Sequence, residues 1–430
     1  MKTKTALKTL FSVIALFIVV VLLINTAPFD EKLNPEVVEI LQSKPMPVAQ
    51  GNAYFALIGI KTELENNITD AGFKIIQEHI KQQGNILTTP ESNNVDSNWM
   101  INYQNNCNSK NNNDCLIQLK QQISEHPIDN KRLKLMLSRY QKIIAMPMYR
   151  NYQEPKFNIY MPTNQYSIMM KLSKIYIASN YQVGSALELL KILDTDLKFW
   201  KMMLNDSTYL IDKMVALNAI RSDIYTLSTL IRDNDNFSEL ELSLIQTILN
   251  PLSAEELDLT ESFIAESRVA FKLFESFGYN DSFFDNLFYQ PNATLNEYYE
   301  QNIKEQKKYS KLSLGSLIDT RTLEKQTAKS TRFNILKFSN LYNFHGKMLV
   351  AYSGCACSDY VVRGYDLNNI IKMVDIQLQT KLSSFNKVEQ IITKSKNINP
   401  FNNKKFDYDS SAKILKFDCL DQYSQCSIKI

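Results

Sequence analysis

All six cysteines of this chain follow a single N-terminal hydrophobic segment, and this arrangement limits where the chain can fold. Lys2, Lys4 and Lys8 precede an apolar run over residues 10–24. A basic start followed by one apolar segment is typical of an export signal. An even number of cysteines beyond it is typical of disulfides formed in an oxidising compartment. The sequence therefore predicts that the bulk of the chain folds outside the cytoplasm.

The N-terminal segment combines features of a membrane anchor and of a signal peptide. Its apolar run of 15 residues is short for a spanning helix and long for the core of a signal peptide. The cleavage-like sequence Asn25-Thr26-Ala27 has a bulky amide at its first position and Pro28 after it, which disfavours cleavage. We therefore expect residues 1–27 to remain as a signal-anchor transmembrane segment. Because the positive charges come first, we expect a single-pass protein of the bacterial inner membrane with its C-terminal domain in the periplasm.

Composition narrows the fold class and excludes one class of partner. A formal net charge of +3 is too small to predict nucleic-acid binding. The chain has only 10 glycines and 12 prolines among 430 residues, and this scarcity favours long helices over strands and turns. We predict a mainly α protein: an antiparallel helical bundle or array with a small C-terminal β-hairpin, preceded by one N-terminal transmembrane helix.

The pattern of prolines and apolar residues divides the exported part into three regions. Residues 28–50 contain four prolines among polar residues, which predicts a stalk between the membrane and the domain. Residues 51–345 are predicted to form a helical domain with a disordered-like loop at 88–114. Residues 346–430 are predicted to form a disulfide-stapled region with a helix and a β-hairpin.

The helical pattern is strongest over residues 128–277, where apolar residues recur three and four positions apart. Two capping boxes, Ser238 with Glu241 and Ser253 with Glu256, mark successive helix starts. The helix that begins after Ser253 is expected to continue unbroken to the end of this range. The range is therefore predicted to be a bundle of antiparallel helices with short connections.

The pattern changes after Pro400. Apolar and polar residues alternate over 406–408 and again over 414–417, on either side of the polar triplet at 409–411. Alternation around a polar turn is typical of a β-hairpin.

Three segments resemble an uncharacterised group of proteobacterial proteins. They are residues 196–200 (Asp-Leu-Lys-Phe-Trp) with 210–214 (Leu-Ile-Asp-Lys-Met), residues 51–59 (Gly-Asn-Ala-Tyr-Phe-Ala-Leu-Ile-Gly), and the ending from Asn399-Pro400-Phe401 to Asp409, which is similar to that group's "NPY…GKPF-YD". The resemblance implies a membrane anchor and a helical exported domain with no established activity. It therefore supplies no catalytic residue.

The ending departs from the pattern of this group at two positions. Asn403 stands where glycine is usual, and Lys405 stands where proline is usual. Both departures leave the type of turn open.

Local motifs of known enzyme classes are missing from the sequence. The three histidines, His79, His126 and His345, form no H-E-x-x-H pair, and the chain has no G-x-S-x-G elbow and no P-loop. We therefore nominate no catalytic residue on motif evidence, and we expect no cofactor and no resident metal.

The cysteines leave several pairings open. Two cysteines that bracket a polar stretch, Cys107 and Cys115, are expected to close a local loop. Cys355 and Cys357 can bond to the two C-terminal cysteines and staple the hairpin. Alternatively, the C-terminal pair bonds locally and leaves a bond between Cys355 and Cys357. The disulfide candidates are Cys107, Cys115, Cys355, Cys357, Cys419 and Cys426.

The Cys355-Ala356-Cys357 sequence also has two functional interpretations. One thiol of a close pair can attack a disulfide while the other resolves it, so the pair can carry thiol–disulfide exchange. Together with His345 and either C-terminal cysteine, the pair can also provide zinc ligands. Structural disulfides are the preferred interpretation.

Lys213 lies near the apolar face of its predicted helix. Because an unpaired buried ammonium is costly, we expect a buried ion pair with Asp196, or with Asp194, on the preceding helix. Arg221 and Asp223 are expected to extend the same network, and we interpret it as structural.

Two functional hypotheses follow. In the first, the protein is a non-enzymatic interaction or scaffolding protein of the cell envelope, held at the membrane and bound to an envelope protein. In the second, it is a periplasmic enzyme of thiol–disulfide exchange that acts through Cys355 and Cys357. The sequence favours the first, because it shows no catalytic constellation.

Overall fold

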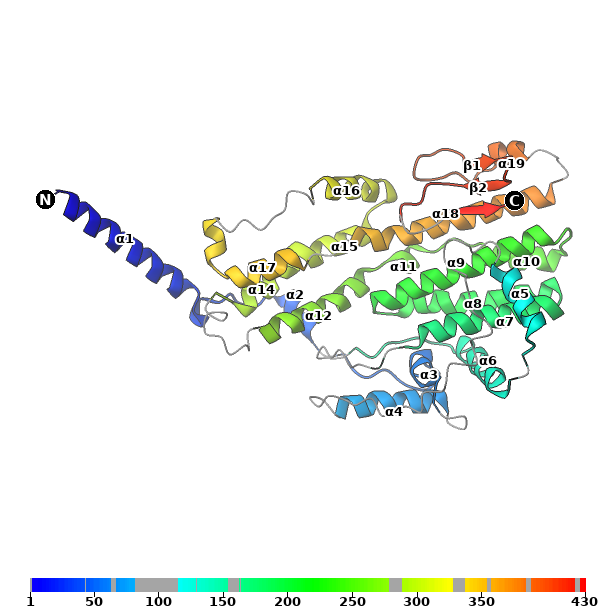
Figure 1. Ribbon diagram of the computed structural model, residues 1–430, viewed down its shortest axis with the longest axis horizontal. Coiled ribbons are helices and arrows are strands. Elements are labelled where there is room, and N and C mark those ends of the chain that lie inside the picture. Colours follow the sequence, from blue (N-terminus) through cyan, green and yellow to red (C-terminus); the bar gives the residue numbers. More distant parts are fainter. Residues whose placement is uncertain are drawn as a thin grey trace. The chain divides into compact units, whose positions relative to one another are not determined.

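The structure, a computed structural model, is mainly helical with a small antiparallel sheet near the C-terminus (Figure 1). It describes residues 2–42, 44–62, 67–81, 115–128, 130–153, 162, 164–277, 288–327, 337–353, 357–383, 388–421 and 426–430. This confirms the predicted fold class. The predicted loop at 88–114, with Cys107, lies outside the described residues.

The chain forms two compact units. Unit 1 comprises Met1–Pro45, Gln153–Phe157 and Leu259–Ser358. Unit 2 comprises Met46–Tyr152, Asn158–Asp258 and Asp359–Ile430. This division groups the chain differently from the predicted boundary at residue 345.

Unit 1 begins with the N-terminal apolar helix and is completed by segments far away in the sequence. Its elements are α1 (Lys2–Ile24), η1 (Ala27–Phe29), α2 (Pro35–Leu41), α12 (Thr260–Phe277), α14 (Pro291–Tyr298), η4 (Tyr299–Ile303), α15 (Lys304–Lys311), α16 (Leu314–Thr327), η5 (Phe338–Leu341) and α17 (Phe344–Tyr352). Its core joins Val37 and Ile40 of α2 to aromatic side chains of α12 and α14. Within α1, the stretch Ala6–Ile24 has a mean hydropathy of 2.8 and is long enough to cross a membrane.

The segment predicted as a stalk is part of this fold. The Asp30 carboxylate accepts the backbone N–H groups of Asn292 and Ala293, both at 3.0 Å, and so caps the first turn of α14. The backbone N–H of Asn34 donates to Asn296 Oδ1 at 2.8 Å. The prediction of a spacer was wrong for residues 28–42, because Asp30 and the backbone of Asn34 bind α14, and Val37 and Ile40 are buried in the core of unit 1.

The C-terminal end of α1 is also fixed by hydrogen bonds. Asn25 is 3% exposed, and its Nδ2 donates to the carbonyl groups of Val21 and Leu341, both at 2.8 Å. Its Oδ1 accepts the backbone N–H of Asn343 at 2.9 Å. Asn343 is fully buried with φ 52°, a left-handed conformation that asparagine tolerates better than most residues.

Unit 2 contains the predicted bundle. Its helices are α3 (Ala53–Gly59), α4 (Ile68–Lys81), α5 (Cys115–Glu125), α6 (Lys131–Ile144), α7 (Tyr166–Val183), α8 (Ala186–Asp206), α9 (Leu210–Asp233), α10 (Glu239–Ile248), α11 (Ala254–Leu257), most of α18 (Cys357–Leu382) and α19 (Val388–Lys394). α8 packs against α7, α9 and α10. Its apolar stripe of Leu189, Leu193, Leu197 and Trp200 is buried, as helical spacing predicts.

The helix starts follow the capping signals. Both predicted capping boxes, at Ser238 and Ser253, are present with reciprocal hydrogen bonds, and Ser185 forms a third. The predicted long helix after Ser253 is wrong, because it divides into α11 and α12. The break leaves the carbonyl group of Asp258 outside a helix, where it accepts a hydrogen bond from Lys213 Nζ at 3.0 Å.

The C-terminal sheet has the order β1 (Asp407–Asp409), β2 (Ile414–Lys416), β3 (Ser427–Lys429), all antiparallel. The first two strands are the predicted hairpin, with Tyr408 opposite Leu415. The third strand, which was not predicted, pairs Ile428 with Leu415. Asn403 has φ 55°, so the position where the resembling group carries glycine is left-handed here.

Candidate functional site

The centre of unit 2 contains charged side chains in an otherwise apolar bundle. Asp196 of α8 is fully buried and accepts hydrogen bonds from Tyr140 Oη of α6 and from Ser173 Oγ of α7, the latter at 2.6 Å. Burial raises the pKa of the Asp196 carboxyl, while the hydrogen bonds from Ser173 and Tyr140 lower it. Through these hydrogen bonds, the Asp196 carboxyl links α8 to α6 and α7.

A second buried carboxyl lies near the first. Asp223 of α9 is 2% exposed, and burial together with the charge of Asp196 raises its pKa well above the usual range. Lys174 of α7 acts in the opposite direction on Asp223, and burial lowers the pKa of Lys174 itself. The bundle therefore holds two carboxyl groups and an ammonium group whose proton affinities depend on one another.

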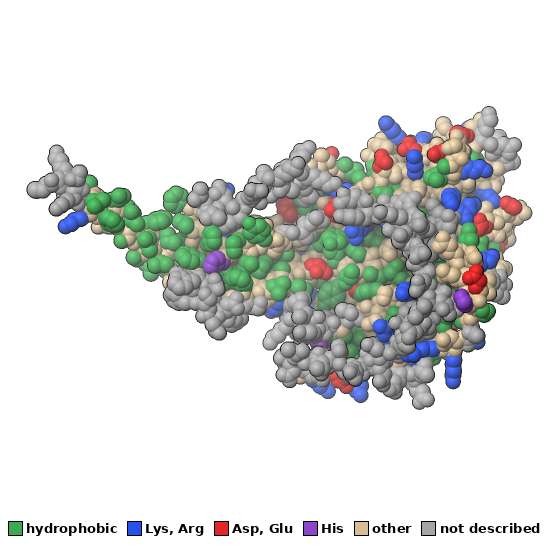
Figure 2. All heavy atoms as spheres, in the orientation of Figure 1, with side chains coloured by type: hydrophobic (Ala, Val, Ile, Leu, Met, Phe, Trp, Pro, Cys, Tyr) green, Lys and Arg blue, Asp and Glu red, His purple; other side chains and the backbone are tan. Residues whose placement is uncertain are grey.

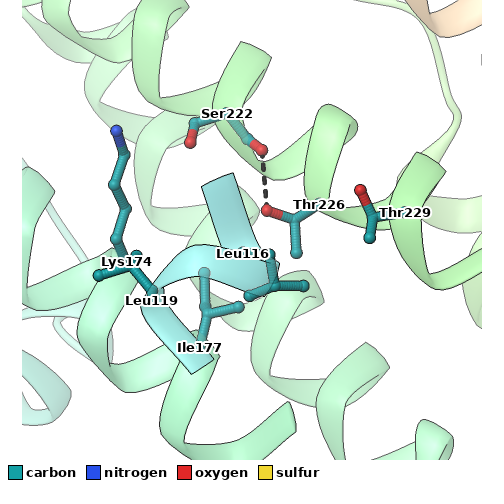
Figure 3. A pocket seen from close by; sticks show the side chains of 7 residues that line it. All are labelled: Leu116, Leu119, Lys174, Ile177, Ser222, Thr226 and Thr229. Carbon is teal, nitrogen blue, oxygen red and sulfur yellow. Dashed lines mark hydrogen bonds between the residues drawn. The ribbon is translucent and has the colours of Figure 1, made fainter. Parts of the chain in front are cut away.

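Lys174 also lines a small cavity (Figure 3). The cavity has a volume of about 20 Å³, which is room for about one water molecule. Apolar side chains of α5 and α7 form one wall, and polar groups of α9 form another, with Thr226 Oγ1 donating to the carbonyl of Ser222 at 3.0 Å. An organic substrate needs a cleft of about 300 Å³ or more, so this cavity suits a bound water molecule rather than a substrate.

A separate network surrounds Asp212, near the start of α9. Asp212 is 1% exposed and accepts hydrogen bonds from Tyr149 Oη at 2.9 Å, from Asn151 Nδ2 and from Tyr166 Oη. Asn164 Nδ2 donates to both tyrosine oxygens, at 2.8 and 2.7 Å. Burial raises the pKa of Asp212, while its three hydrogen bonds lower it. The network fixes the segment before α7 and the first residue of α7 against the start of α9.

The hydrogen-bond partner that the structure shows for Lys213 differs from the predicted ones, Asp196 and Asp194. Lys213 is 3% exposed, as expected, but its Nζ donates to the carbonyl group of Asp258. Asp194 instead pairs with Lys198 one turn further along α8, at 2.7 Å. Asp196 is bound by Tyr140 and Ser173. The burial of Lys213 and Asp196 follows from helical spacing, whereas their partners depend on tertiary packing.

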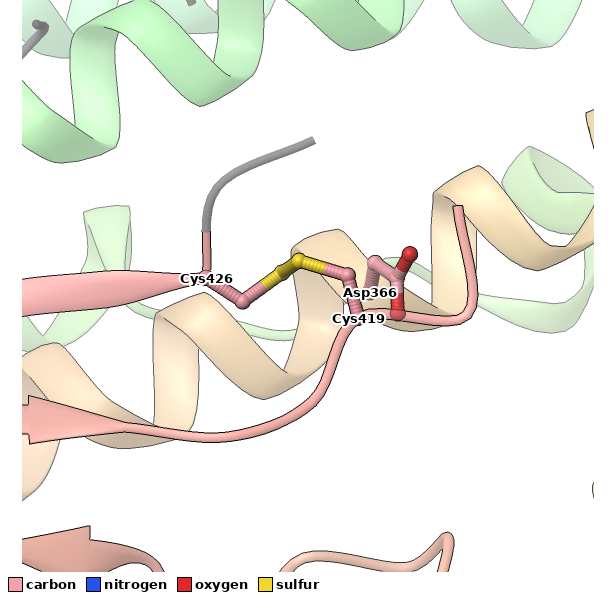
Figure 4. Close-up of side chains that lie close together, drawn as sticks. All are labelled: Asp366, Cys419 and Cys426. Atoms are coloured by element: carbon pink, nitrogen blue, oxygen red, sulfur yellow. A yellow bond between two sulfur atoms is a disulfide. The ribbon is translucent and has the colours of Figure 1, made fainter. Parts of the chain in front are cut away.

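The C-terminal cysteines bond to each other. Cys419 and Cys426 form a disulfide whose Cα atoms are 5.7 Å apart (Figure 4). This excludes the staple from Cys355 and Cys357 to this pair and agrees with the local alternative. Cys357 is also disulfide-bonded and is 1% exposed, while Cys355 lies outside the described residues.

The same disulfide lies beside Asp366 of α18, and a carboxylate oxygen and both sulfur atoms are within 4.8 Å of one another. Because the sulfur atoms bond to each other, they provide no thiolate for a metal ion. This also removes both C-terminal cysteines from the zinc alternative that included His345. The His345 ring packs edge-on against Phe288 and Phe344.

For the carboxyl group of Asp366 we expect a clear effect of pH on the free energy of unfolding. It is fully buried and accepts the backbone N–H groups of Leu420 and Asp421 at 2.9 and 2.8 Å. Burial raises its pKa to about 6, against the effect of those hydrogen bonds and of Arg221. Since the unfolded carboxyl titrates near about 3.9, the folded state binds the proton more tightly. The stabilisation is complete below pH about 4 and is lost as the pH rises through about 6.

We therefore expect this group to lower the free energy of unfolding by up to about 3 kcal/mol between pH about 4 and 6. Asp366→Asn does not titrate, so its stability should change less with pH over that interval. Urea denaturation at several pH values, for the parent protein and the variant, measures the difference. Parallel pH profiles would show that the proton is bound elsewhere.

Several residues of these networks were not predicted. Tyr140, Ser173, Tyr149 and Tyr166 come from three different segments, and no local pattern links them to an aspartate. Asp223, which we expected in the network of Lys213, stands in the apolar stripe of α9 between Ile220 and Leu227, where a charged residue must find a polar partner.

No protein-family model, curated protein or solved structure matches this chain. The resemblance to the proteobacterial group therefore stays a prediction. The residues themselves indicate buried structural networks, because the carboxylates of Asp196 and Asp212 accept hydrogen bonds within the core and the cavity beside Lys174 holds about one water molecule.

Proposed function

We propose that this protein is a single-pass protein of the bacterial inner membrane whose periplasmic helical domain is a non-enzymatic interaction or scaffolding protein of the cell envelope. One observation carries the proposal: the end of α1 is built into the fold of unit 1. Cleavage after Ala27 would remove Asn25 and leave the N–H of the buried Asn343 without its acceptor. An anchor that stays attached to the domain explains these hydrogen bonds, because a signal peptide that is cleaved off would not be part of the folded core.

Charge and redox chemistry support the orientation. Lys2, Lys4 and Lys8 precede the apolar stretch, which favours a cytoplasmic N-terminus. The bond between Cys419 and Cys426 suits the oxidising periplasm on the other side.

The buried aspartates support a non-enzymatic role. Asp196 and Asp212 are within 1% of complete burial, and each accepts hydrogen bonds from side chains of its own unit. A catalytic carboxyl must reach a substrate, and shifted pKa values also arise in structural networks. The alternative, thiol–disulfide exchange through Cys355 and Cys357, has weaker support because Cys357 is bonded and nearly inaccessible.

Membrane extraction and intact mass test the anchor. The protein, expressed with its native N-terminus, should resist alkaline carbonate extraction, keep the mass of the whole chain, and be digested by protease added to spheroplasts but not to intact cells. A mass lacking residues 1–27, or release by carbonate, would contradict the anchor.

Cross-linking in intact cells tests the role. An interaction protein should give one discrete adduct of reproducible composition, and a fusion of the same domain to an unrelated anchor should give it too. Only monomer in both cases, or disulfide reductase activity that disappears in Cys357→Ser, would contradict a non-enzymatic scaffold.

A further inference from the structure

A short apolar segment of unit 1 lies along the C-terminal half of α1. The Phe338 ring, in η5, packs edge-on against Phe17 with ring centroids 6.1 Å apart. Four residues further on, Tyr342 Oη donates to the carbonyl group of Phe29 at 3.1 Å. Between these contacts, Asn25 Nδ2 binds the carbonyl group of Leu341. Residues 337–342, here called the Phe338 segment, therefore follow α1 from its interior to its end.

The contact with Phe17 indicates a depth. Phe17 lies seven residues before Ile24, the last residue of the candidate span, which corresponds to about 10 Å along a helix axis. A hydrocarbon core is about 30 Å thick, so a side chain at this depth is surrounded by acyl chains. Phe338 is 78% exposed in the absence of a bilayer, the same fraction as Tyr352. If α1 crosses the membrane, the ring that touches Phe17 must enter the hydrocarbon as well.

The residues that follow suit the level of the lipid headgroups. Tyr342 reaches the backbone just after α1, and Lys347 Nζ lies 5.9 Å from the centre of its ring. Phe29, in the same turn, is 57% exposed. Tyrosine and lysine are typical of the membrane interface, where a ring lies among the headgroups and an ammonium group reaches water. Lys337, which precedes Phe338, also has a long side chain whose ammonium group can reach water from the membrane interface. Figure 2 shows that apolar side chains continue from α1 onto the adjoining part of unit 1.

We propose that the Phe338 segment is a second membrane contact, which inserts Phe338 among the acyl chains of the leaflet next to the exported domain. This inference rests on the proposed anchoring by α1. Two contacts, one crossing the bilayer and one entering a single leaflet, would hold unit 1 in one orientation at the membrane surface. The occupant of this apolar surface is lipid, because the surface is continuous with the spanning helix.

Tryptophan quenching by brominated lipid tests the insertion. Phe338→Trp is purified as the full chain and placed in phosphatidylcholine vesicles with or without bromine on the acyl chains. Tyr352→Trp is the matched control, since Tyr352 has the same exposure but lies at the far end of α17. The parent protein corrects for Trp99 and Trp200, and circular dichroism confirms folding. We expect the tryptophan at position 338 to lose about half or more of its emission in brominated vesicles, and the control to lose little.

Each outcome is decisive. Equal quenching of the two variants, in protein that resists carbonate extraction, overturns the inserted segment and leaves the anchor intact. Loss of carbonate resistance or of residues 1–27 in the parent protein overturns the proposed anchor and the inference with it. Shielding of position 338 from aqueous acrylamide in native membranes, but not in pure lipid vesicles, also overturns the inference, because the ring would then face a protein.

Discussion

Replacing Gly72 with alanine is expected to lower the free energy of unfolding of unit 2 by more than about 3 kcal/mol. A Cβ atom at this position would lie 1.8 Å from the carbonyl oxygen of Phe55 and 2.9 Å from the backbone nitrogen of Gly59. Both are backbone atoms of α3, so no side-chain rotation can relieve the contact. The two helices would have to separate.

Separation is costly because α3 has no free surface. All seven of its residues, Ala53–Gly59, are buried, and Phe55 and Leu57 are fully buried in the main core of the unit. The approach is reciprocal, since a Cβ on Gly59 would lie 1.9 Å from the carbonyl oxygen of Ile68. Moving α3 by the distance that a methyl group needs would open voids on its other sides.

Denaturant unfolding followed by tryptophan fluorescence measures the effect, because Trp200 is fully buried in the same unit. Gly315→Ala is the control. Gly315 also lies in a helix, but a Cβ there would have no atom within 4 Å. Alanine at that site should leave stability unchanged or raise it by up to about 1 kcal/mol. Similar midpoints for Gly72→Ala and the parent protein would show that α3 and α4 do not pack as closely as the structure has them.

Sequence patterns located the elements whose signals are local. The capping boxes at Ser238 and Ser253 and the apolar stripe of α8 were sufficient to predict where these helices lie, because each signal depends on residues within a few turns of one another. α3 was not predicted as a helix, since a segment that is buried on every side has no periodicity. β3 is as short as β1 and β2, but ten residues separate it from β2, so it lacks the short polar turn that marked the predicted hairpin.

The positions of buried polar residues could be predicted better than their partners. Asp196 and Lys213 both interrupt apolar stripes, and both are buried. Their partners come from segments that only the fold brings together, such as Tyr140 and the carbonyl group freed by the break at Asp258. The prediction of a stalk was wrong over residues 28–42 for the same reason. Its polar composition suits water equally well, and nothing local shows that Asp30 caps a helix 262 residues away.

Removal of the Asp212 carboxylate is the second large effect that we expect. Asp212→Ala should lower the free energy of unfolding by about 3 kcal/mol or more, because each buried donor left without a partner costs about 1–3 kcal/mol. Three donors would be affected: the hydroxyl groups of Tyr149 and Tyr166 and the amide of Asn151. Asn164, which donates to both hydroxyl groups, cannot replace the lost acceptor through its amide nitrogen.

The variants around this site distinguish the loss of an acceptor from the loss of a charge. Asp212→Asn keeps the size and one oxygen but turns an amide toward the donors, so its stability should lie between the parent protein and Asp212→Ala. Asp194→Ala removes an aspartate whose partner, Lys198, is 69% exposed, and it should cost about 0.3–0.5 kcal/mol. Urea denaturation of all three variants at neutral pH gives the comparison. If Asp212→Ala costs no more than Asp194→Ala, the hydroxyl groups of the two tyrosines must be satisfied by water, and the buried network cannot be what holds the N-terminal end of α7 to α9.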